Sequence, residues 1–165
     1  MPMSCAICNG DKNRGEILRL KNGTIFVCGD CQSYSMLDTV RIQGGFTVVP
    51  VKSSSLQRAL RELTYIRPWR RKAMHNVFLA FYYEESVSYV GKVERVKPKV
   101  GRDQVSHLLP SNAAWGRKEF YTIYCLEYLD ELKNPIPRGG CSPVQSKLTV
   151  PFKKFVRAKT VCDLR

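Results

Sequence analysis

The chain has 165 residues, of which 44% are hydrophobic and 25% charged, and its formal net charge is +13. This composition excludes an intrinsically disordered chain, and no apolar run approaches the roughly 20 residues that span a bilayer. A surplus of Lys and Arg this large is typical of proteins with a polyanionic partner. We therefore expect a partner that is nucleic acid, RNA or DNA, or a ribonucleoprotein or polymerase complex, and no membrane.

The first residues, MPMSC, lack a basic and apolar leader, and the seven cysteines are an odd number with uneven spacing. Both features favour an intracellular protein, cytoplasmic or nucleoid-associated, in which thiols stay reduced. A small viral or archaeal accessory protein would fit this description. We expect no disulfide framework, and Cys125, Cys141 and Cys162 are expected to be solitary.

The other four cysteines form two Cys-x-x-Cys pairs, Cys5 with Cys8 and Cys28 with Cys31, and nineteen residues separate the pairs. Zinc takes about four thiolates in a tetrahedron, and each pair supplies two of them from one tight turn. The pattern therefore predicts a structural Zn²⁺ site. A redox pair and an iron–sulfur cluster are the alternatives.

Between the pairs, EILRL and TIFVC flank KNG, which predicts a hairpin with its turn at Asn22-Gly23. QSYSMLDTVRI after the second pair has the apolar spacing of a short helix. This order, with CAICNGDKN and TIFVCGDC, resembles the treble-clef zinc-binding domain of the ClpX unfoldases over about residues 4–41. The resemblance implies a docking or dimerisation module that a bound metal ion holds together, and a possible homodimer. It implies no ATPase, because the chain has no P-loop motif.

QGGFTVVPVKSSS is rich in turn residues and reads as a domain boundary, although FTVVPV also fits a strand. SSSLQRALRELTYI predicts an amphipathic helix with Ser55 as its N-cap, and RPWRRK follows it. Charge for phosphates and an aromatic ring for stacking predict a nucleic-acid contact here. The alternatives are a core-packed helix with a solvated basic face and a tryptophan plugged into the core. The expected contacts are Arg58, Arg61, Arg67, Trp69, Arg70, Arg71 and Lys72.

From residue 76 the pattern changes to strands: NVFLAFYYE, SVSYVGKVERV and FYTIYCLEYLDEL, the last ended by NPIP. GRDQVSHLL predicts a short helix, and VPFKKFVRAKTVCDL a longer one. The strand order and the NPIP loop resemble PUA-like folds, and within them EVE-type domains. The resemblance implies a basic, aromatic-lined concavity that binds RNA, or DNA with a flipped or modified base. Further basic contacts are expected at Lys153, Lys154 and Arg157.

These patterns predict an α+β protein: a treble-clef zinc finger at residues 1–45, a linker and basic helix at 46–75, and a small, mixed, β-barrel-like (PUA-like) domain with short helices at 76–165. We expect a non-enzymatic nucleic-acid-binding protein, because neither of the two histidines lies in a catalytic motif.

Two alternatives stay open. The first is an adaptor or inhibitor that docks on an RNA polymerase, a ribosome or a defence complex through the zinc module. The second is a metal-dependent nuclease that would use the carboxylates of Glu84, Glu85, Asp130 and Glu131 with Lys133.

Overall fold

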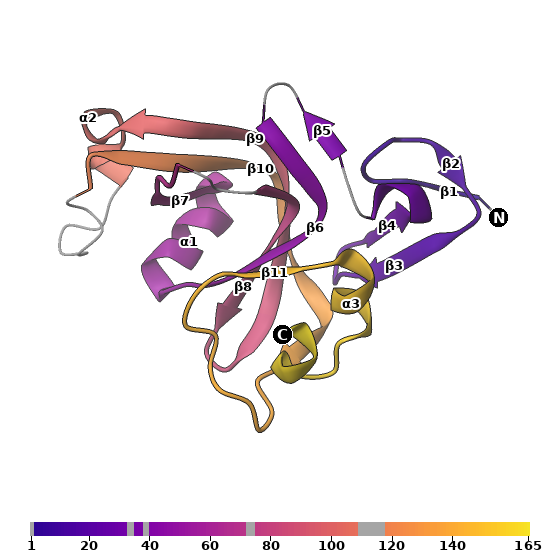
Figure 1. Ribbon diagram of the computed structural model, residues 1–165. Coiled ribbons are helices and arrows are strands. Elements are labelled where there is room, and N and C mark those ends of the chain that lie inside the picture. The colour runs from indigo at the N-terminus through magenta and orange to yellow at the C-terminus, as the bar shows by residue number, and fades with distance from the viewer. Residues whose placement is uncertain (1, 33–34, 38–39, 72–74, 109–117) are drawn as a thin grey trace.

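The computed structural model describes residues 2–32, 35–37, 40–71, 75–108 and 118–165. Strands dominate this part of the chain, and three short helices accompany them, so the protein is of mixed α and β class (Figure 1). None of the helices in these ranges has the length and apolar character that a membrane crossing needs.

The N-terminal module carries two small hairpins, and the rest of the chain builds one seven-stranded sheet. The module contains β1 (Met3–Ser4), β2 (Asp11–Lys12), β3 (Gly15–Arg19) and β4 (Thr24–Cys28). The sheet contains β5 (Ser35–Leu37), β6 (Val40–Pro50), β7 (Thr64–Pro68), β8 (His75–Tyr83), β9 (Ser86–Gly101), β10 (Phe120–Pro137) and β11 (Leu148–Val150). The helices are α1 (Ser53–Glu62), α2 (Arg102–Val105) and α3 (Phe152–Arg157).

The sheet runs in the order β11-β6-β8-β9-β10-β7, and β5 pairs with β6 outside this path. The β6–β8 pair is parallel, whereas the other pairs are antiparallel. Within the described residues no pairing joins β11 to β7, so the sheet is open and the expected barrel-like closure is not found. Register shifts between β9 and β10 bend this long ribbon instead.

The strand β8 lies at the centre of the sheet, and its first eight residues are buried. HNVFLAFYY is a nearly continuous apolar run, which is typical of a strand covered on both faces. On one face, Phe46 of β6 stacks on Phe78 of β8 and on Phe155 of α3, with ring centroids 5.2 and 3.8 Å away. On the other face, Leu56 and Ala59 of α1 pack in a separate cluster with Phe81, Tyr124 and other strand residues. The sheet is therefore the middle of three layers.

Several expectations from the sequence are confirmed. The β3–β4 hairpin forms, and Leu20 donates its backbone N–H to the carbonyl of Gly23 across the turn at 2.8 Å. The strands expected from NVFLAFYYE and SVSYVGKVERV form β8 and β9, and Glu84 and Glu85 make the tight turn between them with positive φ values of 47° and 71°. Residues 102–108 form the short α2 and a 3-10 turn, and Ser53–Glu62 form α1, whereas the last three residues of SSSLQRALRELTYI belong to β7.

Other expectations are wrong. The described residues within QSYSMLDTVRI form β5 and the start of β6 instead of a helix, because they pair with each other and with β8. Without that helix, the described part of the module lacks the last element of a treble clef. Lys52, not Ser55, is the N-cap of α1. The strand β10 continues through Pro135 to Pro137, past an irregularity in its pairing with β9, although the prolines predicted its end.

Two further differences concern the segment 46–75 and the cysteines. The sequence predicts a linker and a basic helix here; the helix is α1, and the described residues around it also contribute the end of β6 and β7 to the sheet. The division into domains at residues 45 and 75 stays a prediction. Cys141 and Cys162 are not solitary: they form a disulfide with their Cα atoms 5.6 Å apart. It closes the segment that contains β11 and α3.

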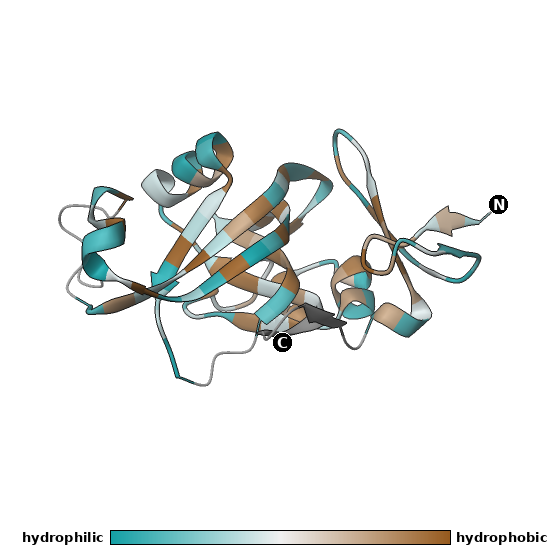
Figure 2. Ribbon diagram, turned by 90° about the horizontal axis from the view of Figure 1, so that it is seen from above, coloured by the Kyte–Doolittle hydropathy of each residue, from teal (hydrophilic) through white to brown (hydrophobic). Residues whose placement is uncertain are grey.

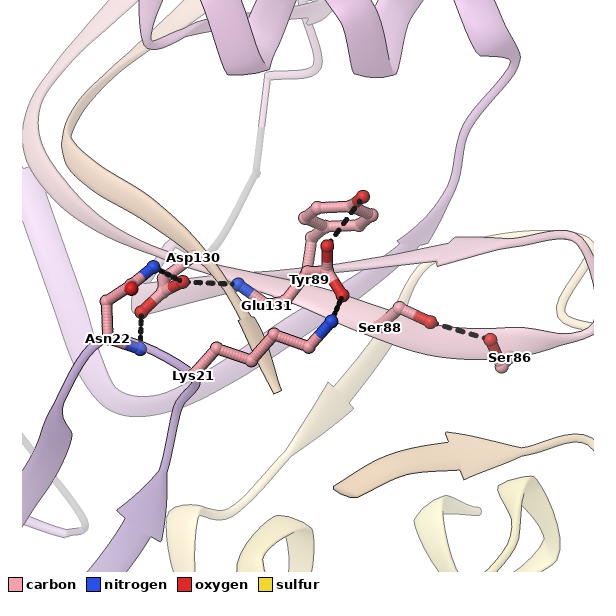
Figure 3. Close-up of polar contacts among 7 residues, drawn as sticks. All are labelled: Lys21, Asn22, Ser86, Ser88, Tyr89, Asp130 and Glu131. Atoms are coloured by element: carbon pink, nitrogen blue, oxygen red, sulfur yellow. Dashed lines mark hydrogen bonds and ion pairs between the residues drawn. The ribbon is translucent and has the colours of Figure 1, made fainter. Parts of the chain in front are cut away.

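The N-terminal hairpin is attached to the sheet by a polar cluster, which we call the hairpin clamp: Lys21, Asn22, Tyr89, Asp130 and Glu131 (Figure 3). Asn22 donates its backbone N–H and its side-chain amide to the Asp130 carboxylate, at 3.0 and 2.9 Å. Lys21 pairs with Glu131, which also accepts a hydrogen bond from the Tyr89 hydroxyl at 3.3 Å. Seen from above, the module lies at one side of the sheet, next to the C-terminal segment (Figure 2). The clamp and this contact fix its position.

We expect Asp130→Ala to lower the free energy of unfolding by about 1 kcal/mol, because the change removes two exposed hydrogen bonds from Asn22 to a charged acceptor and water replaces them only in part. Urea denaturation monitored by fluorescence measures this. Glu127→Ala is the matched control, since Glu127 lies on the same strand and makes only an exposed ion pair with Lys92 at 3.3 Å. An equal loss of unfolding free energy in both variants would show that the clamp contributes no more to stability than an exposed ion pair.

Candidate metal centre and basic cavity

The four cysteines of the two Cys-x-x-Cys pairs come together in the N-terminal module. The Sγ atoms of Cys5, Cys8, Cys28 and Cys31 all lie within 4.8 Å of one another, and Cys8 and Cys28 are 4.0 Å apart. Sulfurs bound to one tetrahedral Zn²⁺ at 2.3 Å would be about 3.8 Å apart. These four residues can therefore hold a metal ion with little movement. They are the one such group of Cys, His, Asp or Glu among the described residues.

Backbone amides already surround one of these thiols. Ile7 and Cys28 each donate a backbone N–H to Sγ of Cys5 at 3.4 Å. Burial acts to raise the pKa of Cys5, but hydrogen bonds from the backbone of Cys28, Cys8 and Ile7 outweigh it and lower the pKa to about 6. Burial, together with the neighbouring thiols of Cys28 and Cys8, raises the pKa of Cys31. Hydrogen bonds from amides to thiolates are the usual surroundings of a metal-bound cysteine.

The backbone packing around the second pair depends on two glycines. A Cβ on Gly15 would collide with the carbonyl oxygen of Val27, and a Cβ on Gly44 would collide with that of Cys31. Gly44 belongs to β6, so the second cysteine pair lies directly against the sheet. The metal centre is thus attached to the sheet through the backbone of β6 as well as through the hairpin clamp.

A separate feature is a cavity of about 650 Å³, which we call the basic cavity. Its walls are the end of β6, the first turn of α1, the strand β7 and the segment 145–147 before β11. Four cations line it: Lys52, Arg67, Arg70 and Lys147. Its other lining residues are Val49, Pro50, Val51, Ser54, Ser55, Tyr65, Ile66, Pro68, Gln145 and Ser146, so it has no Asp or Glu.

Within the described part of the chain, none of these four cations makes an ion pair. Burial, followed by the charges of Arg67 and Arg70, lowers the pKa of Lys147. The nearby His75 is buried and shares a hydrogen bond between Nδ1 and the Tyr124 hydroxyl at 2.9 Å. Burial, followed by Lys147 and Arg67, lowers its pKa. The like charges are therefore close enough to repel one another.

The first turn of α1 adds positive potential to the same cavity. Its N-cap is Lys52, and no side chain accepts a hydrogen bond from the first-turn amides. A helix N-terminus carries a partial positive charge and is usually capped by an oxygen acceptor. Here a lysine occupies that position, and Ser54 and Ser55 line the cavity. Together with the cations, this turn makes the cavity a strong attractor of anions.

The residues expected to contact nucleic acid fall into several groups. Arg67 and Arg70 reach the basic cavity. Arg58 and Arg61 both lie 3.9 Å from the Glu62 carboxylate, and Arg71 is exposed outside the cavity lining. Lys72 lies outside the described residues.

The aromatic candidate and two of the three C-terminal candidates have intramolecular partners. The rings of Trp69 and Phe120 meet edge to face with centroids 6.0 Å apart, and Lys99 lies over the Trp69 ring at 4.6 Å. On α3, Arg157 pairs with Glu16 of β3 at 3.0 Å, and Lys154 donates to the backbone oxygen of Arg165. Lys153 is exposed and lines an open hollow beside α3.

Lys52 and Lys147 were missed by the sequence analysis. The position of Lys52 just before the helix is a signal that could have found it. Lys147 has no such signal, because it reaches the cavity only through the pairing of β11 with β6.

Three of the four carboxylates of the nuclease hypothesis are engaged elsewhere, and Glu84 is exposed. Asp130 and Glu131 belong to the hairpin clamp, and Glu85 pairs with Arg138 at 2.9 Å. In the described ranges they do not join with a third acidic or histidine ligand into a metal-binding group.

No family model matches the chain, and no curated protein matches it. Among solved structures, the chain is similar to the crystal structure of a mutant of the ZmASCH protein from Zymomonas mobilis. The TM-score is 0.48 and the sequence identity 13%, over 64% of this chain and 88% of that chain. None of the comparisons names the ClpX-type or PUA-like families, so these resemblances stay predictions.

We expect Cys8→Ser to reduce bound zinc from about one ion per chain to none, because three thiolates and a hydroxyl make a much weaker site. Elemental analysis of the purified protein measures this. Cys125→Ser is the matched control, since Cys125 is a free cysteine of β10 that lies outside the four-cysteine group. Full zinc occupancy in Cys8→Ser, or no zinc in the unchanged protein, would contradict the assignment.

Proposed function

We propose that the protein is a non-enzymatic nucleic-acid-binding protein, in which a structural Zn²⁺ on the four cysteines stabilises the N-terminal module and the basic cavity contacts phosphate groups. The observation that carries this proposal is the basic cavity, because four cations converge there without a carboxylate among its lining residues. Crowded like charges cost free energy, and an anion bound between them offsets that cost.

The chemistry of the cavity suits phosphate. Arginine presents a planar fork of donors that matches two phosphate oxygens, and lysine adds a mobile point charge. The uncapped first turn of α1 offers further amide donors. The net charge of +13 supports a polyanion as the source of these phosphates, since it attracts such a partner over the whole surface.

The zinc site has a supporting part in this proposal. Four thiolates complete the coordination of Zn²⁺ and leave no position for a reactive water, so the site would be structural. The bound ion would hold the hairpin and the second cysteine pair in place against β6 and β10. Its removal should therefore act on stability first, and on nucleic-acid binding through it.

We expect the triple variant Arg67→Gln/Arg70→Gln/Lys147→Gln to bind single-stranded oligonucleotides much more weakly than the unchanged protein. It should also lower the slope of log K against log salt concentration by about 0.7 for each lost phosphate contact. Fluorescence anisotropy at several salt concentrations measures both effects. Thermal unfolding of each variant shows whether the fold is retained.

Lys133→Gln is the matched control for one unit of charge, because Lys133 is exposed on β10 and makes no ion pair among the described residues. It should leave the salt slope nearly unchanged. No binding by the unchanged protein, or a flat salt dependence, would overturn the proposed function. Equal losses in the triple variant and in Lys133→Gln would place the contact elsewhere.

A further inference from the structure

We propose that the basic cavity binds a terminal phosphate, the phosphomonoester at the end of a nucleic-acid strand, in preference to the phosphodiesters inside it. This inference rests on the proposed function and specifies the ligand of the same site. The juxtaposition that carries it is four unpaired cations and an uncapped helix N-terminus around one cavity.

The first argument is the balance of charge. An internal phosphodiester brings one negative charge, and would leave most of the positive charge of Lys52, Arg67, Arg70 and Lys147 uncompensated. A phosphomonoester carries a charge of about −1.5 to −2 at neutral pH and three strong acceptor oxygens. It therefore satisfies two or three of these cations at once, together with amides of the α1 turn. The number of donors at the site matches the monoester better.

The second argument is the shape of the site. The cavity is lined by the end of β6, the first turn of α1, β7 and the segment 145–147. A strand end brings one chain into the cavity, whereas an internal phosphate brings chain on both of its sides, so a strand end reaches the cations with less chain to accommodate. Arg67, Arg70 and Lys147 also line a small neighbouring hollow of about 10 Å³ with Thr122 and Tyr124. That hollow is too small for a base, so it extends the donor-rich end of the cavity without admitting a second nucleotide.

The third argument is the space beyond the cations. At about 650 Å³, the cavity lies in the range of roughly 300–1,000 Å³ that small-molecule sites occupy, and it exceeds the needs of a lone phosphate ion. Apolar groups of Val49, Val51, Tyr65 and Ile66 line part of it. A phosphate at the cations would therefore leave room for the attached sugar and base against apolar walls. The preferred ligand is a terminal nucleotide with its phosphate, rather than inorganic phosphate.

The test compares oligonucleotides of one sequence that carry a 5′-phosphate, a 3′-phosphate or hydroxyls at both ends. The fluorescent label is placed at the end opposite the phosphate, and each phosphorylated form has an unphosphorylated partner with the same label. We expect one phosphorylated form to bind at least about tenfold more tightly than its partner, since the monoester accepts further charge-assisted hydrogen bonds. A nucleoside monophosphate with the same phosphate position should compete better than inorganic phosphate.

The substitution Lys147→Gln tests the assignment to the cavity, and Lys133→Gln controls for the change in charge. Lys147→Gln should remove most of the preference for the phosphorylated end and keep the weaker binding of the unphosphorylated strand. Lys133→Gln should retain the preference. Retention of the full preference by Lys147→Gln would overturn the assignment to the cavity.

Three further results decide between this inference and the proposed function, or overturn both. Equal affinity for all three oligonucleotides, with a steep salt dependence, would overturn end recognition and leave nucleic-acid binding standing. Competition by inorganic phosphate equal to that of the nucleotide would overturn the part assigned to the sugar and base. No binding of any oligonucleotide would overturn both proposals.

Discussion

The close backbone contact of β6 with its neighbours is the constraint on which the rest of this structure depends. Near its start, Gly44 lies against the carbonyl of Cys31, so the second cysteine pair touches the sheet directly. In the middle, Phe46 stacks on aromatic rings of β8 and α3 and forms the centre of the main core. At its end, Pro50 leads through Val51 to Lys52 and α1, which border the basic cavity. One strand thus connects the cysteine site, the hydrophobic core and the cavity, and a displacement of β6 would disturb all three.

This connection defines what a metal ion on the four cysteines would contribute. The N-terminal module is small, and it buries few side chains of its own, among them Ile25, Phe26 and Val27. A module of this size rarely folds on burial alone, and a structural metal supplies the missing free energy. The module contacts β10 through the hairpin clamp and β6 through Gly44. For this reason the ion would stabilise the sheet as well as the module. The proposed recognition site is separate, because the basic cavity shares no lining residue with the four cysteines.

The sequence predicted the elements whose signals are local and missed those that depend on distant partners. Cys-x-x-Cys spacing, Asn22-Gly23 and the apolar run of β8 each determine structure within a few residues, so the cysteine site, the hairpin and the central strand could be predicted. The residues of β5 and early β6 have helical spacing, but pairing with β8 outweighs that preference. Only some of the cavity cations could be predicted. Arg67 and Arg70 lie in a basic run of the sequence. Lys147 reaches the cavity because β11 pairs with β6, which lies about a hundred positions earlier in the chain.

The distribution of ion pairs separates the cations that stabilise the fold from those that are available to a ligand. Arg157 with Glu16, Lys21 with Glu131, and Arg138 with Glu85 each join two segments that are distant in sequence. Among the described residues the cavity cations do not have this structural use, and burial, followed by the charges of Arg67 and Arg70, lowers the pKa of Lys147. The fold maintains this repulsion because β7, α1 and β11 are positioned by their packing and pairing in the core. On the proposed function, an anion bound in the cavity would offset this repulsion. For this reason binding affinity and stability are coupled: substitutions that weaken anion binding at the cavity should make the free protein slightly more stable.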